Sequence, residues 1–183
     1  MTNFATDAEV TADLFQATDT EDREMGLADL FEHALKDMYY SEQEIYKALS
    51  IIIRAAQDPA LKDALSSHRE ETSEHIELLE EVFEDLGKEP EADPCDAIDG
   101  ILAEANALIG IFNASKAVDA AIVFSAQAVE HYKITRYGSM HAFAIALRMD
   151  RAAERISYIL DQEMAADETL ATLADISLNA AAA

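Results

Sequence analysis

The chain has few of the residues that make turns and covalent cross-links. Its 183 residues include one cysteine, three prolines, five glycines and no tryptophan. The single cysteine, Cys95, excludes an internal disulfide framework and is typical of a reducing compartment. Scarce glycine and proline, together with abundant alanine, leucine, isoleucine and glutamate, favour long helices over sheets. We therefore predict an all-α protein.

Basic residues are also scarce. The sequence has 13 lysines and arginines against 37 aspartates and glutamates, which gives a formal net charge of -24. Phosphate groups would be repelled by such a chain, so nucleic acid and anionic membrane surfaces are excluded as partners. The acidity is typical of a solvated surface or of adaptation to high salt, and its alternative role is attraction of cations.

Long apolar runs are missing as well. A membrane-spanning helix needs about 18 consecutive apolar residues, whereas the longest such patch, residues 49–53, is far shorter. No charged-then-apolar leader opens the chain, so we expect a cytoplasmic protein. The length suits one domain, which we place at residues 26–178 between an acidic tail (1–25) and a C-terminal tail (179–183). A short amphipathic helix over residues 9–16 is the alternative for the first tail.

What the sequence does contain is helical periodicity. Apolar residues at helical spacing predict long helices over residues 27–57, 61–86, 116–148 and from 150 onward, with a shorter one through 98–109. Helix boundaries are indicated by capping and terminating residues: Asp58-Pro59, Gly87, Asp93-Pro94, Ser115 and Asp150. Two helical hairpins joined by a crossover that contains the fifth, shorter helix predict an antiparallel four-helix bundle.

Polar side chains interrupt the apolar stripe of each long helix. In the second helix, His68, Glu71 and His75 stand where a core-facing helix normally has leucine or isoleucine. At 1.5 Å per residue, the interruptions lie at similar heights in the bundle. The candidate ligands are Glu42, His68, Glu71, His75, Glu130, Glu163 and Asp167.

Clustered buried carboxylates must share protons or surround cations, because they repel one another in a low dielectric. Several carboxylates with one or two imidazoles suit two iron or manganese ions, as in ferritin-like bundles, whereas zinc expects fewer carboxylates. Either His68 or His75 can partner Glu71, and His75 is favoured because it extends toward Glu42. His68 is then a neighbour of the ligands.

Several motifs give the chain a resemblance to a known family. They are Phe31-x-His33-x-Leu35-x-Asp37-x-Tyr39-x-x-Glu42, His68-x-x-Glu71-Thr72, Cys95 with Glu104-Ala105, Gln127-x-x-Glu130-His131-Tyr132 with Tyr137-Gly138, and Glu163-x-x-x-Asp167-x-x-Leu170. Over residues 26–174 the chain resembles the YciF/YciE-like family of ferritin-like proteins. This resemblance implies a five-helix ferritin-like fold, a homodimer, a rubrerythrin-like dimetal centre and a link to bacterial stress responses. Lys133 stands where that family tends to have glutamate, so no ligand is expected there.

Three functions remain open at this point. The first is a di-iron or di-manganese oxidoreductase acting on oxygen or peroxide. The second is non-catalytic metal binding or storage. The third is a metal-free helical interaction module, in which lysine or arginine would neutralise the carboxylates. The only basic residues at the right height, Lys133 and Arg136, are expected on adjoining faces, which counts against this third reading.

Overall fold

The structure, a computed structural model, describes residues 24–183. Within them it contains five long helices, one π-helical segment and a short final helix. These are α2 (Leu27–Ala55), α3 (Pro59–Asp85), α4 (Asp96–Phe112), α5 (Val118–Ala146), α6 (Asp150–Leu173), η1 (Ala174–Leu178) and α7 (Asn179–Ala182). This part of the chain has no strand, which confirms the predicted all-α class.

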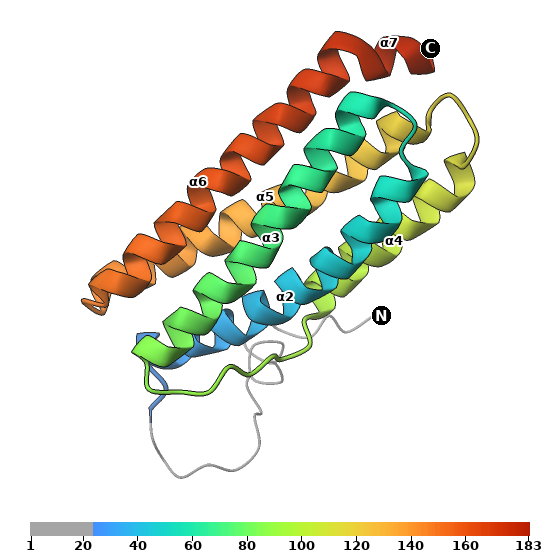
Figure 1. The fold of residues 1–183 in the computed structure, drawn as a ribbon. Coiled ribbons are helices and arrows are strands. Elements are labelled where there is room, and N and C mark those ends of the chain that lie inside the picture. Colours follow the sequence, from blue (N-terminus) through green and yellow to red (C-terminus); the bar gives the residue numbers. More distant parts are fainter. Residues whose placement is uncertain (1–23) are drawn as a thin grey trace, which may run out of the picture.

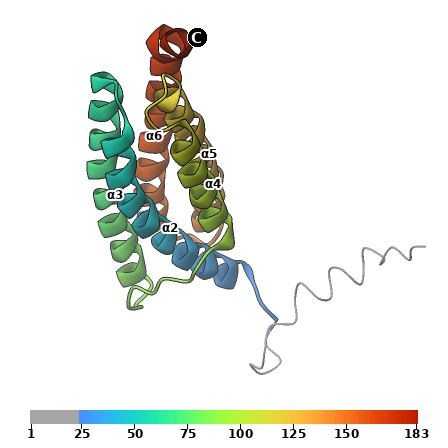
Figure 2. The same ribbon diagram turned by 90° about the vertical axis from the view of Figure 1, so that its right-hand side faces the viewer.

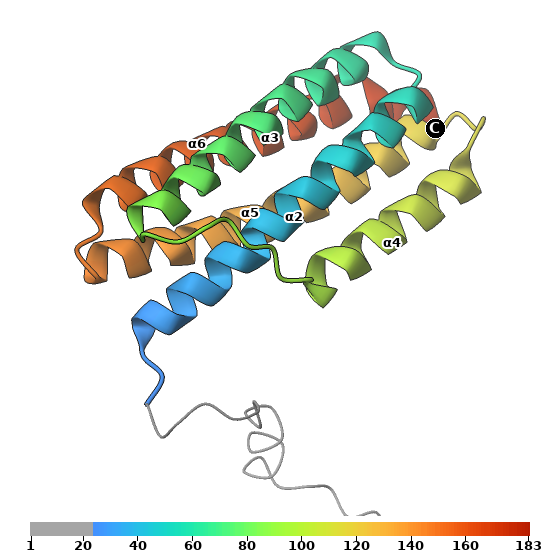
Figure 3. The ribbon, with the colours of Figure 1, turned by 60° about the horizontal axis from the view of Figure 1, so that its bottom comes forward.

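Helices α2, α3, α5 and α6 form the predicted antiparallel four-helix bundle (Figure 1). α2 and α3 make one hairpin and α5 and α6 the other, with α3 packed on α6 and α2 packed on α5. α4 lies outside the four, against α5 and α2, as the side view of Figure 2 and the tilted view of Figure 3 show. Because α4 carries the chain back along the bundle, α5 runs parallel to α3.

The turn between α2 and α3 follows the sequence signals. The carboxylate of Asp58 accepts hydrogen bonds from the backbone N–H groups of Ala60 and Leu61, at 2.8 and 3.1 Å. These two N–H groups have no partner within the helix, so the cap satisfies them. At the other end of α3, Gly87 has a φ of +67°, a left-handed conformation that costs glycine little.

The starts of α4 and α5 lie later than the sequence indicated. α4 begins at Asp96 and α5 at Val118, so neither Asp93 nor Ser115 is a helix cap. Ser115 instead accepts a hydrogen bond from the backbone N–H of Ala117 at 3.2 Å, in a turn that precedes the helix. A short polar residue favours such local turns as readily as a cap, which is why the sequence signal was ambiguous.

The apolar core is divided into two clusters along the bundle. The first lies around the α2–α3 turn, includes α4, and contains Ile45, Leu49, Leu65, Ile98 and Ile122 among others. The second lies toward the α5–α6 turn and contains Phe31, Leu79, Phe83, Tyr137 and Ile156 among others. Buried polar and charged residues lie between these two apolar clusters.

Two further expectations concern the N-terminal tail and membrane-spanning helices. The predicted acidic tail and its alternative, a helix over residues 9–16, fall on residues 1–25, almost all of which lie outside the described range. Among the described residues, no helix has both the length and the apolar character that a membrane crossing requires.

Candidate metal centre

A layer of charged side chains lies between the two apolar clusters. Each bundle helix contributes to it, because a charged residue interrupts each apolar stripe. We call these six buried residues the polar layer: Glu42 from α2, His68 and His75 from α3, Glu130 and Lys133 from α5, and Glu163 from α6. Burial of so many ionisable groups costs free energy unless they are paired with one another or hold an ion.

The first triad in the polar layer consists of His68, Glu130 and Glu163. Each offers one donor atom within 4.8 Å of the other two. The Nε2 atom of His68 lies 3.1 Å from Oε1 of Glu130, and the Nδ1 atom lies 3.4 Å from Oε2 of Glu71. Glu71 therefore contacts His68, where the sequence favoured His75; spacings of three and four residues both put a pair on one helix face, so the pattern did not decide between them.

The second triad consists of Glu42, His75 and Glu163, so the two triads share Glu163. The Nδ1 atom of His75 lies 2.9 Å from Glu163 Oε1 and 3.9 Å from Glu42 Oε1. Its other nitrogen, Nε2, lies 2.6 Å from Oε1 of Gln162, and donating there leaves a lone pair on Nδ1 in the neutral ring. The buried hydroxyl of Tyr137 donates a 2.6 Å hydrogen bond to Glu42 Oε1. Two of the three members of this triad, His75 and Glu42, are thus held in place by hydrogen bonds from residues outside it.

Lys133 lies inside the polar layer, which corrects the interpretation that placed it on an adjoining face. Its Nζ atom is 2.6 Å from Glu163 Oε1 and 3.1 Å from Glu42 Oε2, and its side chain is 0% exposed. The buried face of α5 passes through Glu130 and Lys133, three residues apart, while Ile134 is only partly buried. One residue turns a helix by 100°, so a stripe drawn through Ile134 points Lys133 away from the core.

Ionic interactions within the polar layer shift several pKa values. Burial alone lowers the pKa of Lys133, but Glu163, Glu42 and Glu130 outweigh it and raise that pKa, so the ammonium is charged at neutral pH. Burial also lowers the pKa of His68, and Glu130 outweighs it, raising the pKa to about 10. For Glu130 burial raises the pKa, whereas the charges of His68 and Lys133 outweigh it and bring it to about 2. Without metal, the layer is a network of ion pairs.

Two of the seven predicted ligands lie at the edge of the polar layer. Glu71 is 34% exposed, and its hydrogen bond with His68 lowers its pKa against the opposing effect of burial. Asp167 is 22% exposed and takes part in neither triad. It accepts a 3.3 Å hydrogen bond from Gln127 and lies 3.4 Å from His131 Nδ1. The other five predicted ligands are the members of the two triads.

The donor atoms of the triads meet a test for metal binding. Several buried side-chain atoms of the polar layer have no hydrogen-bond partner. They are Oε2 of Glu42, Nε2 of His68, Nδ1 of His75, Oε2 of Glu130, Nζ of Lys133 and both carboxylate oxygens of Glu163. Buried polar atoms are nearly always hydrogen-bonded, so such a group needs another partner. Carboxylate oxygens and imidazole nitrogens that converge in this way fit a metal ion.

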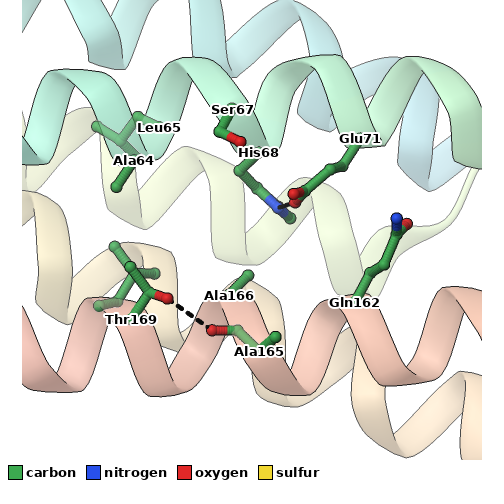
Figure 4. Close-up of a pocket in the computed structure, with 10 residues that line it drawn as sticks. Ala64, Leu65, Ser67, His68, Glu71, Gln162, Ala165, Ala166 and Thr169 are labelled. Carbon is green, nitrogen blue, oxygen red and sulfur yellow. Dashed lines mark hydrogen bonds and ion pairs between the residues drawn. The ribbon is translucent and has the colours of Figure 1, made fainter.

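A pocket opens from the molecular surface toward the first triad. It lies between α3 and α6 and has a volume of about 170 Å³. Figure 4 shows His68 and Glu71 reaching from α3 toward α6, where Gln162 stands. The remaining lining residues are two leucines, Leu65 and Leu170, and five smaller residues, Ala64, Ser67, Ala165, Ala166 and Thr169. A molecule the size of water or peroxide can therefore approach His68.

Three functional side chains escaped the sequence reasoning. Lys133 was assigned to an adjoining face because the apolar stripe of α5 was drawn through Ile134. Tyr137 was counted among apolar positions, although its spacing of seven residues from Glu130 puts both on one face of α5 and gave a usable signal. Gln162 precedes Glu163 on α6 and carries no pattern that distinguishes it from a surface glutamine.

Comparison with known proteins adds relatives of similar length. A family described as "Domain of unknown function (DUF892)" matches residues 26–183. Protein YciF of Escherichia coli (strain K12) is 34% identical over 154 residues, which cover 84% of this chain and 93% of that protein. The chain is thus similar to YciF over nearly the whole helical bundle.

Solved structures agree with this likeness. The crystal structure of the E. coli stress protein YciF has a TM-score of 0.81 at 33% identity, covering 85% of this chain and 99% of that one. YcfI from Rhodopseudomonas palustris has a TM-score of 0.81 at 42% identity, covering 84% and 98%. A protein from Xanthomonas campestris pv. campestris, at 19% identity and a TM-score of 0.67 over 85% and 94%, shares the fold.

Proposed function

The chain belongs to the family described as a domain of unknown function, DUF892, and from its buried cluster of carboxylates and imidazoles we propose that it is a metal-binding protein of the bacterial stress response. The proposed metal is iron or manganese, and the proposed chemistry is the reduction of oxygen or peroxide. The association with stress comes from the relative in E. coli, which is described as a stress protein. The family resemblance adds a second copy of this chain as a proposed partner.

The observation that carries the proposal is the convergence of buried donor atoms from four helices. Two overlapping triads bring carboxylate oxygens and imidazole nitrogens within 4.8 Å of one another, and most of these atoms lack a hydrogen bond. A bundle that needed only packing would fill this layer with apolar side chains, because buried charges cost several kcal/mol each when unpaired. A bound cation offsets that cost.

The donor set favours iron or manganese over other metals. The triads together contain three carboxylates and two imidazoles, Glu42, His68, His75, Glu130 and Glu163. Mixed oxygen and imidazole ligands suit iron and manganese, whereas structural zinc sites prefer sulfur and nitrogen. Cys95, the single cysteine, accepts or donates a hydrogen bond at 3.2 Å to Tyr132 and is not part of either triad.

The residues around the triads would prepare the site for a small oxidant. Iron or manganese, when bound, supplies one-electron chemistry that protein side chains lack. Gln162 and Tyr137 fix the orientations of His75 and Glu42 through the hydrogen bonds described above. The pocket beside His68 admits a small molecule to the first triad while the apolar clusters exclude bulk water on either side.

Metal content tests the proposal directly. Untagged protein purified without chelator would be analysed by mass spectrometry, comparing the wild type with Glu130→Gln. Gln has nearly the shape of Glu but no charge, so we expect the variant to lose metal while remaining folded by circular dichroism. Glu168→Gln is the matched control, because Glu168 is exposed on α6, and it should retain wild-type metal content.

The proposed reduction of oxygen or peroxide is tested by a separate measurement. Metal-loaded wild type should consume peroxide, and Glu130→Gln should not. A fully loaded protein that turns over neither oxygen nor peroxide would leave metal binding without catalysis, the storage alternative. Uptake far above two ions per chain would favour storage outright. A wild type that holds no metal and refuses added metal would point to the metal-free interaction module, which the ion pairs of Lys133 make a specific alternative.

A further inference from the structure

The second triad already contains a cation. The ammonium of Lys133 lies within ion-pair distance of two of its members, Glu42 and Glu163, and no water reaches it. In the first triad Lys133 contacts only the shared Glu163, and no ion pair joins it to His68 or Glu130, whereas in the second triad it bridges both carboxylates. The two halves of the polar layer, which share Glu163, are therefore not equivalent.

An ammonium and a metal ion cannot both occupy the second triad. A transition metal lies about 2 Å from a carboxylate oxygen, and the same oxygens already have Lys133 Nζ at 2.6 and 3.1 Å. An ion coordinated by both carboxylates would compete with Nζ for the space between them, and the two cations would repel each other. The ammonium cannot withdraw to solvent by a small rotation, because the Lys133 side chain is 0% exposed.

The charges of the polar layer favour a single ion. Its three fully buried carboxylates, those of Glu42, Glu130 and Glu163, carry three negative charges when ionised. Lys133 neutralises one of them, and one divalent ion neutralises the other two. A second divalent ion would leave an excess of positive charge among the fully buried groups of the layer, which is costly in a low dielectric.

Access from solvent points to the same half of the layer. Of the six residues of the polar layer only His68, a member of the first triad, is among the residues that line the pocket between α3 and α6, together with Glu71. An ion entering through this pocket meets the first triad, with the partly exposed carboxylate of Glu71 beside it.

We propose that Lys133 takes the place of a second metal ion, so that each chain binds one ion, at His68, Glu130 and Glu163, beside a fixed ammonium. This inference rests on the proposed metal binding and revises the expectation of two ions per chain. The ammonium holds Glu42 and Glu163 in position, as a metal would, but it has no redox chemistry and no open position for an oxidant.

Manganese stoichiometry tests the inference. The wild type, Lys133→Ala and the exposed-site control Lys116→Ala would be stripped with chelator and titrated with Mn²⁺ in a calorimeter. We expect one ion per chain in the wild type and in the control. In Lys133→Ala the second triad is vacated and its negative charge is released, so we expect two ions per chain.

The outcomes separate the inference from the proposed function. No Mn²⁺ in the wild type would overturn metal binding altogether. Two ions in the wild type, or one in both the wild type and Lys133→Ala, would overturn the role of Lys133 while metal binding stands.

A second measurement needs no variant, in case Lys133→Ala does not fold. Electron paramagnetic resonance of the Mn²⁺-loaded wild type should show the resolved hyperfine splitting of an isolated ion. The spectrum of an exchange-coupled manganese pair would overturn the inference.

Discussion

Individual side chains of the polar layer depend on neighbours that coordinate nothing themselves. Tyr137 is an example, because its buried hydroxyl donates a 2.6 Å hydrogen bond to Glu42 Oε1. The pKa of Tyr137 lies well above its ordinary value, first because of burial and then because of the charges of Glu42 and Glu163. The phenol therefore stays protonated and serves as a donor at any working pH.

Removal of that donor should destabilise the protein. In Tyr137→Phe the carboxylate of Glu42 loses a charge-assisted hydrogen bond in a buried place, and we expect the free energy of unfolding to fall by about 1–3 kcal/mol. Urea denaturation followed by circular dichroism measures the loss. Tyr158→Phe is the control, since Tyr158 is exposed and its hydroxyl makes only surface hydrogen bonds, to Glu74 at 3.3 Å and from Gln162 Nε2 at 2.9 Å. Equal stability of the two variants would contradict the prediction.

The pair of His68 and Glu130 predicts a pH dependence for the metal-free protein. The pKa of His68 is raised from 6.5 to about 10, so its stabilising effect is complete below pH 6.5 and is lost as the pH rises through 10. The pKa of Glu130 is lowered from 4.5 to about 2, so its effect is complete above pH 4.5 and is lost as the pH falls through 2. The pair contributes fully between pH 4.5 and 6.5.

Denaturation of chelator-treated protein at several pH values checks this dependence. We expect the free energy of unfolding of the wild type to decline between pH 6.5 and 10. In His68→Gln no imidazole titrates at this position, so the decline should be shallower, although the variant starts from a lower stability. Parallel profiles for the two proteins would show that His68 does not carry the effect.

At the scale of helices, α3 illustrates how a terminus is stabilised. Asp58 satisfies two backbone N–H groups at its start. We therefore expect Asp58→Ala to lower the free energy of unfolding by about 0.5–2 kcal/mol. Thermal and urea denaturation would measure it against Asp63→Ala, which changes an exposed aspartate inside the same helix. Asp63→Ala should be neutral or mildly stabilising because alanine favours helix interiors; a larger loss there than at Asp58 would refute the role of the cap.

The helices could be predicted from sequence because their signals are local. The apolar stripes, Asp58 with Pro59 and the left-handed Gly87 each act over a few residues, and all three predicted the observed hairpin of α2 and α3. The height of the polar layer also followed from sequence, since the helical rise is constant. The two triads therefore contain five of the seven predicted ligands.

The direction in which a side chain points was harder to predict. Lys133 and Ile134 differ by 100° around α5, and sequence preference alone assigns the isoleucine to the core and the lysine to solvent. The opposite arrangement occurs because carboxylates from α2 and α6 surround the lysine. These partners are distant in sequence, so no local pattern reveals them. For the same reason the contact of Glu71 with His68 could not be distinguished from one with His75.

At the scale of the whole molecule, charge is the dominant feature. The formal net charge is -24, and repulsion between like charges opposes the compact state. Salt screens such repulsion, with a Debye length of about 30 Å at 0.01 M and about 3 Å at 1 M. Exposed pairs such as Arg155 with Glu81 weaken at the same time, but surface pairs contribute only about 0–1 kcal/mol each.

We therefore expect the melting temperature to rise when sodium chloride is added to protein in dilute buffer. Circular dichroism at increasing salt concentration measures the rise. Potassium chloride at equal ionic strength is the control, because screening does not depend on which monovalent cation is used. A melting temperature that falls with salt, or that differs strongly between the two salts, would contradict simple screening.

The polar layer also limits how the four bundle helices can slide along one another. Apolar clusters tolerate exchange of one leucine or isoleucine for another, so a helix displaced by one turn, about 5.4 Å, still finds apolar neighbours. Glu42, His75, Lys133 and Glu163 have no such freedom, because each needs its partners at a single height. A shifted helix would strand a charge against hydrocarbon, at a cost of several kcal/mol. The charged layer thus fixes the axial register of the bundle, whether or not an ion is bound.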